Sequence, residues 1–252
     1  MLIIVLLTQL AKKGSNHVII FVIFAILMSF SIQISPNESL YIRDPQSTGT
    51  GRDILRNAIP LMQDLGFEKF TFKKLAQRMG ASEITIYRYF ENKHKLLLYL
   101  LSWYWEWVKY SIIFNCHNIR DSKEKLKIAI RTVIESNRRN PLVDYIDEGK
   151  LYALVIEESE KAYHTKQVDQ ENRKGMFLTL KSLKSEISAI IGEINPNYPF
   201  ANSLASTILE MSSSLRFYAN HLPSMADISD LEEIDQQLCN FISQLAFSAL
   251  EC

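Results

Sequence analysis

Apolar residues recur at helical spacing in the stretch from residue 51 to 67. They form a single stripe, and a helix with such a stripe buries it against another element. The stripe consists of Ile54, Leu55, Ala58, Leu61, Met62 and Leu65. Gly66 follows and marks the end of the helix, because glycine adopts the left-handed conformation in which many helices end. Pro60 lies inside the stretch, where its missing N–H predicts a kink without a break.

Two further helix starts follow at Thr71 and Ser82, whose hydroxyls can accept hydrogen bonds from the unpaired N–H groups of a first turn. The helix after Thr71 ends before Gly80. The helix after Ser82 carries Ile86 and Phe90 on one side, while its other side is polar and rich in donors. Helices this short are marginal alone, so we expect all three to pack into one small core.

A helix, a tight turn with glycine and a second helix with polar side chains form the arrangement that places a recognition helix in the major groove of DNA. Residues 51 to 95 contain nine basic and five acidic residues, which gives about +4 in a chain that is neutral as a whole. Such a basic module is typical of a domain that meets phosphate, joined to one that does not. From charge alone, an ordinary solvated helical surface explains these residues equally well.

The rest of the chain also has helical patterning, so the predicted fold class is all-α. Six further helices are predicted at residues 92–114, 122–139, 143–160, 163–194, 200–220 and 227–250. The first of them links a head, residues 51–97, to a helical body, residues 98–252. The last two carry apolar stripes that include Leu215 and Leu238. The sequence allows two interpretations of these two helices: they form a dimer face, or they belong to the core of a single chain.

The stretch from about residue 51 to 100 resembles the N-terminal DNA-binding domain of the tetracycline-repressor (TetR) family. Its run TIYRYFENKHKLL, residues 85–97, is highly specific for that family. Further matching positions are Ile54, Leu55, Ala58, Gly66, Phe67, Thr71, Leu75, Ala76, Gly80 and Ser82. The resemblance implies a bacterial transcription regulator, usually a repressor, whose partner is double-stranded DNA. It also implies a homodimer on a palindromic operator and a body that binds a small-molecule effector.

The same resemblance assigns DNA-binding roles to a set of residues in the head. They are Thr71, Ser82, Glu83, Ile84, Thr85, Tyr87, Arg88, Tyr89, Lys93 and His94. Tyr87 and Lys93 are expected to contact phosphate, and Arg88 to contact either guanine or phosphate. Ile86 and Phe90 are expected to be buried and structural only.

Aromatic side chains in the body suit an effector pocket that is mostly apolar. The candidates are Trp103, Tyr104, Trp107, Tyr110 and Phe177. For any single one of them, ordinary core packing is the stronger interpretation.

Residues 1–50 precede the head as a leader and an arm. An apolar run over residues 18–34 is near the length that crosses a bilayer. A transmembrane helix there would place the head outside the cell by the lysine and arginine rule, and a secretory signal would also export it. We therefore favour translation from Met28, without residues 1–27, and a cytoplasmic protein. Residues 35–50 are rich in Pro, Ser, Thr and Gly, which predicts a linker or arm.

The sequence carries no pattern for catalysis or metal binding. Cys116, Cys239 and Cys252 are far apart, and the five histidines are scattered. Neither a C-x-x-C pair nor a glycine-rich phosphate loop occurs. We therefore expect no enzyme, no cofactor and no metal. The alternative to a soluble regulator is a membrane-tethered helical protein whose head serves sensing or interaction.

Overall fold

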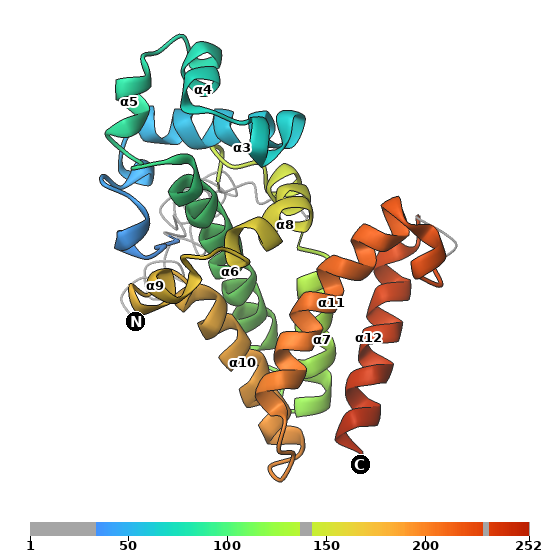
Figure 1. Cartoon of the computed structure of the whole chain (residues 1–252). Coiled ribbons are helices and arrows are strands. Elements are labelled where there is room, and N and C mark those ends of the chain that lie inside the picture. The colour runs from blue at the N-terminus through green and yellow to red at the C-terminus, as the bar shows by residue number, and fades with distance from the viewer. Residues whose placement is uncertain (1–33, 137–142, 229–231, 252) are drawn as a thin grey trace, which may run out of the picture. The chain divides into compact units, whose positions relative to one another are not determined.

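The computed structural model of the chain describes residues 34–136, 143–228 and 232–251. Its contacts divide the chain into two units, and the larger one, residues 34–139 and 145–252, contains every element discussed below. Within the described ranges the elements are all helical (Figure 1). The predicted all-α fold is confirmed.

The head consists of α3 (Gly49–Lys69), α4 (Phe72–Met79) and α5 (Glu83–Tyr87), and α4 packs on both α3 and α5 (Figure 1). Ile54, Leu75 and Ile86 come from the three helices in turn, and none of them has exposed surface. Thr71 caps α4 as predicted, since its Oγ1 accepts a hydrogen bond from the Lys74 N–H at 3.2 Å. One small apolar core therefore holds α3 together with two helices, α4 and α5, that are too short to be stable alone.

The kink predicted at Pro60 is wrong, because the backbone of α3 departs from helical geometry at Gly66 instead. Gly66 has φ 74° and ψ 154°, a conformation that glycine adopts readily and other residues avoid. One further helical turn follows, in which the Phe70 N–H donates to the Gly66 carbonyl at 3.1 Å. We refer to residues Phe67–Lys69 as the post-kink turn. Glycine thus redirects the chain between the main part of α3 and the start of α4.

In the part of the chain that the structure describes, the body consists of seven α-helices. They are α6 (Lys93–Cys116), α7 (Ser122–Ile134), α8 (Glu148–Tyr163), α9 (Val168–Arg173), α10 (Leu178–Ile194), α11 (Ala201–His221) and α12 (Ile234–Leu250). Helix α6 packs against α7, α8 and α10, and α12 packs against α7 and α11. Figure 1 shows α3 lying next to α8, the body helix on which the head rests.

Several predicted boundaries in the body are wrong. The single helix predicted for residues 163–194 is two helices, α9 and α10, because Gly175 has φ 76° and ends the first of them. Asp121 caps α7 in place of Ser122, with its Oδ1 accepting from the Lys123 N–H at 3.0 Å. Helix α8 begins at Glu148 and α12 at Ile234, both later than the apolar patterning predicted.

The arm predicted as a linker is packed on the molecule. It contains two short 3₁₀ helices, η1 (Glu38–Leu40) and η2 (Pro45–Ser47), and Leu40 has no exposed surface. Gln46 Oε1 accepts hydrogen bonds from Trp103 Nε1 at 3.3 Å and from the Tyr145 hydroxyl at 2.8 Å. Turn-forming composition predicts local backbone freedom, but it carries no information about such distant partners.

No helix in the described part of the chain is both long and apolar enough to cross a bilayer. The predictions about residues 1–27 and a start at Met28 lie outside the described residues.

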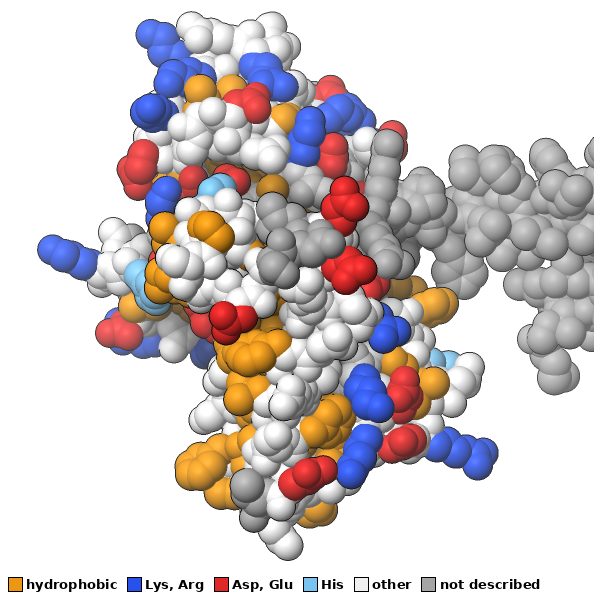
Figure 2. Space-filling model, turned by 90° about the vertical axis from the view of Figure 1, so that its right-hand side faces the viewer, with side chains coloured by type: hydrophobic (Ala, Val, Ile, Leu, Met, Phe, Trp, Pro, Cys, Tyr) orange, Lys and Arg blue, Asp and Glu red, His pale blue; other side chains and the backbone are white. Residues whose placement is uncertain are grey.

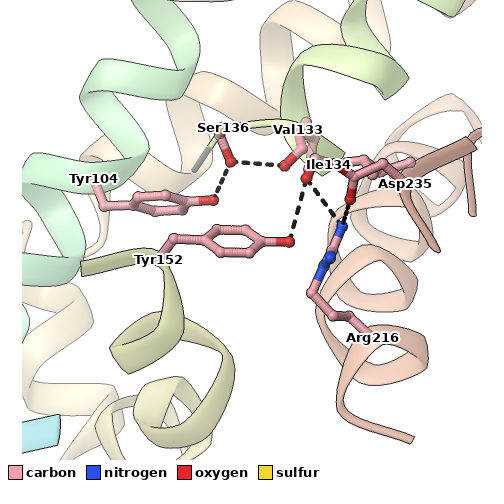
Figure 3. A network of polar contacts seen from close by, with 7 residues as sticks. All are labelled: Tyr104, Val133, Ile134, Ser136, Tyr152, Arg216 and Asp235. Carbon is pink, nitrogen blue, oxygen red and sulfur yellow. Dashed lines mark hydrogen bonds and ion pairs between the residues drawn. The ribbon is translucent and has the colours of Figure 1, made fainter. Parts of the chain in front are cut away.

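A buried polar network surrounds the C-terminal end of α7 (Figure 3). The hydroxyl groups of Tyr104 in α6 and Ser136 lie 2.6 Å apart, and Ser136 also donates to the Val133 carbonyl at 2.8 Å. Burial raises the pKa of the Tyr104 phenol. The last carbonyls of a helix have no partner within it, so these hydroxyls satisfy groups that would otherwise be buried unpaired.

The next carbonyl, that of Ile134, accepts from two side chains at once. The Tyr152 hydroxyl and Arg216 Nη2 each lie 3.3 Å from it, and Arg216 also pairs with Asp235 (Figure 3). Burial raises the pKa of Tyr152 to about 12, and the nearby Arg216 guanidinium opposes only part of this rise. The network therefore joins α6, α7, α8, α11 and α12 through one helix end.

Leu238, predicted for a dimer face, has no exposed surface and belongs to the core of the single chain. Leu215 on α11 is half-buried. Periodicity identified the buried stripe of α12 but could not decide which neighbour buries it.

We expect Arg216→Ala to lower the free energy of unfolding by about 2 to 3 kcal/mol, because it leaves the Ile134 carbonyl and Asp235 without their charged partner. The effect stays below that of a fully buried pair because the Asp235 side chain is 36% exposed. Urea unfolding at equal protein concentration measures it. Arg120→Ala, an exposed arginine between α6 and α7, is the control. Equal stability of the two variants would contradict this role.

Candidate nucleic-acid interface

The turn between α4 and α5 has the geometry of a helix end followed directly by a helix start. Gly80 adopts a left-handed conformation with φ 63°, and the Ala81 N–H donates to the Ala76 carbonyl at 2.9 Å. Ser82 precedes α5 as predicted but does not cap its backbone. Its Oγ lies 3.2 Å from Thr85 Oγ1 instead. Both hydroxyls thus stay at the surface beside the start of α5.

Helix α5 divides into a buried side and an exposed side. Ile86 is fully buried, as is Phe90 just beyond the helix, which confirms their predicted structural role. Ile84 is 66% exposed and Tyr87 48% exposed, and Arg88 is exposed directly after them. Two large apolar side chains and an arginine exposed on one side of a short helix make this side suited to a partner.

The start of α4 lies next to this exposed side. The Phe72 ring meets the Tyr87 ring edge to face, with centroids 5.0 Å apart, and thereby places the phenol. Thr71, the neighbour of Phe72, is exposed, as is Ser82, whereas Glu83 and Thr85 are half-buried. The structure therefore brings Thr71 together with the residues of α5, although eleven residues separate Thr71 from Ser82.

Lys73 is an exposed basic residue that the sequence interpretation left out of the interface. It follows Phe72 in the first turn of α4, and its charge was the signal that could have identified it. Lys74 is different, because its Nζ donates to the Lys69 carbonyl at 2.8 Å. Figure 2 shows Lys and Arg side chains gathered over the head, at the top of the view. Such a surface attracts a polyanion.

Tyr89 does not belong to the exposed side, so its predicted DNA contact is corrected. It is 4% exposed, and its hydroxyl lies 2.8 Å from Thr48 Oγ1. Its carbonyl accepts from the Ile42 N–H at 2.8 Å. Tyr89 therefore holds the arm and the start of α3 on the head.

Lys93 and His94 also point elsewhere. Lys93 Nζ donates to the carbonyls of Phe67 and Glu68, at 2.9 and 3.0 Å. His94 Nε2 lies 2.8 Å from Glu171 Oε1, beside a cavity of about 580 Å³ between the start of α6 and α9. Both residues were assigned to DNA by their place in the motif, and tertiary contacts engage them within the chain.

The five aromatic candidates for an effector pocket lie in different surroundings. Trp103 is fully buried, Tyr104 belongs to the polar network, and Phe177 packs on Tyr163 with ring centroids 5.6 Å apart. Trp107 lines a cavity of about 370 Å³ between α6 and α7. Tyr110 is 40% exposed. Of the five, only Trp107 lines this cavity.

Within the described ranges, no three His, Cys, Asp or Glu side chains gather closely enough to hold a metal ion.

Comparison with known families identifies the head. A model described as bacterial regulatory proteins, tetR family, matches residues 54–100. The head is a TetR-type DNA-binding domain. The matched residues run from within α3 to the first part of α6, so the TetR-type helix-turn-helix consists of α4, the turn at Gly80 and α5.

Two relatives named nucleoid occlusion factor SlmA match in part. The protein of Haemophilus influenzae (strain PittGG) is 27% identical over 100 residues, 40% of this chain and 45% of the relative. That of Haemophilus ducreyi (strain 35000HP / ATCC 700724) is 32% identical over 100 residues, again 40% of this chain and 48% of the relative. The matched part thus spans less than half the length of these relatives.

Solved structures of similar fold cover both head and body. AibR in complex with isovaleryl coenzyme A and operator DNA has a TM-score of 0.53 at 14% identity, over 77% of this chain and 97% of AibR. The fatty acid degradation regulator FadR from Bacillus halodurans has a TM-score of 0.54 at 17% identity, over 78% of this chain and 95% of FadR. At these identities the likeness concerns the fold alone.

Tyr87 and Tyr89 allow a matched test of the interface in this TetR-type head. We expect Tyr87→Phe to weaken binding to all duplexes by about 1 kcal/mol, through loss of a phosphate contact, with little change in stability. Tyr89→Phe should instead lower the free energy of unfolding by about 1 kcal/mol and leave DNA affinity unchanged. Fluorescence anisotropy with labelled duplexes and urea unfolding measure the two effects. The reverse pattern would show that the exposed tyrosine is not the contact.

Proposed function

We propose that the protein is a ligand-responsive transcriptional repressor that binds a palindromic operator as a homodimer. The observation that carries the proposal is the exposed side of α5, where Ile84, Tyr87 and Arg88 face solvent on a basic head. An arginine at the surface of a recognition helix suits a bidentate contact to guanine, and an isoleucine suits the methyl group of thymine. DNA as the partner places the protein's action in the cytoplasm.

A dimer is supported by the exposed apolar surface of the last helix, α12. Phe241 and Leu245 in α12 lie one turn apart and are 51% and 40% exposed. Figure 2 looks onto the side where α12 lies and shows hydrophobic side chains gathered below the head. A two-fold symmetric dimer that pairs this surface with its copy has two heads, and two heads match the two half-sites of an operator.

Control by a small molecule is supported by the body and by a structural neighbour. The cavity between α6 and α7 combines the Trp107 ring with polar groups such as Ser111 and Thr132, a mixture typical of ligand sites. AibR was solved with isovaleryl coenzyme A and operator DNA. We propose that an effector in the body shifts the dimer between two states with different affinity for DNA.

Selection from random duplexes tests the proposal. The wild type should enrich a sequence with two-fold symmetry, with half-sites about one helical turn or a multiple of it apart. Binding should fall steeply with salt, because each neutralised phosphate releases counterions. Arg88→Ala should relax the preference at one base pair at a cost of about 1 to 3 kcal/mol. Failure to enrich any sequence would contradict the proposal.

The dimer surface has its own test. Leu245→Lys should yield a monomer by light scattering and weaken binding to the two-half-site operator, because it places a charge in an apolar interface. Gln236→Lys, an exposed position on the same helix, is the control. A Leu245→Lys protein that stays dimeric would show that the interface lies elsewhere.

A further inference from the structure

The post-kink turn, Phe67–Lys69, begins with a backbone N–H that its own sequence cannot satisfy. The first N–H groups of a helical turn have no partner within it, and a side chain at the preceding residue normally accepts one of them. Here that residue is Gly66, which has no side chain. Glu158 Oε1, in α8 of the body, accepts from the Phe67 N–H at 3.0 Å. The carboxylate lies against the glycine itself, since a Cβ on Gly66 would be 3.6 Å from Oε1.

The other end of the same turn is capped by a cation. Lys93 Nζ donates to the Phe67 and Glu68 carbonyls and lies 4.5 Å from the centroid of the Phe67 ring. An anion at the start of a helical turn and a cation at its end both match the direction of the backbone dipoles. The post-kink turn is therefore held at both ends by residues far away in the sequence.

Glu158 is buried at this position and is 4% exposed. A buried carboxylate is stable only with charged or hydrogen-bonding partners. Lys161 Nζ lies 2.6 Å from Glu158 Oε2, one turn further along α8. The carboxylate is thus supported from the body and directed at the head.

This contact differs in kind from the rest of the packing between α3 and α8. Apolar contacts are not directional, so two packed helices can slide or rotate a little at low cost. A hydrogen bond from one backbone N–H to one carboxylate oxygen tolerates only a narrow range of distance and angle. The Glu158 contact therefore selects one arrangement among those that the apolar contacts allow.

We propose that Glu158 is a positioning residue that fixes the angle of the DNA-binding head on the body. In a dimer this angle sets the separation of the two recognition helices, and hence the half-site spacing that the protein accepts. The second statement rests on the function proposed above, whereas the first concerns the folded chain alone. Lys93, the first residue of α6, holds the other end of the post-kink turn.

The angle itself is tested without DNA, by residual dipolar couplings of backbone amides in the full chain. In the wild type the amides of α3 to α5 and those of α7 to α12 should fit one common alignment tensor. Glu158→Met fills a similar volume without an acceptor, and we expect it to give separate tensors for head and body. Glu158→Gln keeps an acceptor and should behave as the wild type. Glu157→Met makes the same change at an exposed neighbour and is the control.

A second experiment tests the consequence for DNA. Affinities are measured for a single selected half-site and for two half-sites at the selected spacing and at spacings one to three base pairs longer or shorter. Glu158→Met should keep the affinity for a single half-site. Its affinity for two half-sites at the selected spacing should fall about tenfold, because a mobile second head has a lower effective concentration at its half-site. Its dependence on spacing should also become flatter.

A common alignment tensor in folded Glu158→Met would overturn the proposal. If that variant does not fold, Glu158→Ala also removes the acceptor, and a common tensor in that variant would overturn the proposal as well. Separate tensors together with an unchanged spacing profile would overturn the link to half-site spacing. Absence of any half-site binding by the wild type would instead contradict the proposed function and leave the dipolar result to decide the positioning role.

Discussion

Burial of the first half of α6 on nearly all sides is the constraint on which the rest of the structure depends. From Leu96 to Trp105 every side chain of this helix is buried. A helix buried all round needs neighbours on every face, and α7, α8, α10 and η1 supply them. Because α6 begins directly after the helix-turn-helix, the same helix that organises the body also carries the head. Any rearrangement of the body around α6 therefore also moves the end of the DNA-binding domain, from which α6 continues.

The second constraint is the satisfaction of buried backbone groups at helix ends. The end of α7 is closed by Ser136, Tyr152 and Arg216, which come from different parts of the chain. The post-kink turn is closed in the same way by Glu158 and Lys93. At both places the polar groups of one helix end specify how several helices meet, which apolar packing alone leaves loosely defined.

In the head, one short sequence motif contains residues with two different roles, exposure to solvent and contacts within the chain. Tyr87 and Arg88 face solvent, while Tyr89 and Lys93, only a few residues further on, hold the arm and the post-kink turn. The specificity of the family motif thus reflects both the surface that meets DNA and the contacts that orient it. Residues of the second kind determine where the recognition helix points without any contact to the nucleic acid.

Hydrophobic spacing and capping residues were sufficient to predict the all-α fold and the helix-turn-helix, because these features depend on neighbours in the sequence. The family was suggested separately, by the resemblance of the motif at residues 85–97. The interruption of the first helix at Gly66 agrees with the helix end predicted there. The helical turn after Gly66, the break at Gly175 and the packed arm were missed, since each is decided by a backbone conformation or a partner that the local pattern does not contain. The exposed side of α5 followed from periodicity, but the roles of Tyr89, Lys93 and His94 did not. Their side chains reach partners up to 77 residues away, and only the tertiary structure brings such groups within hydrogen-bonding distance.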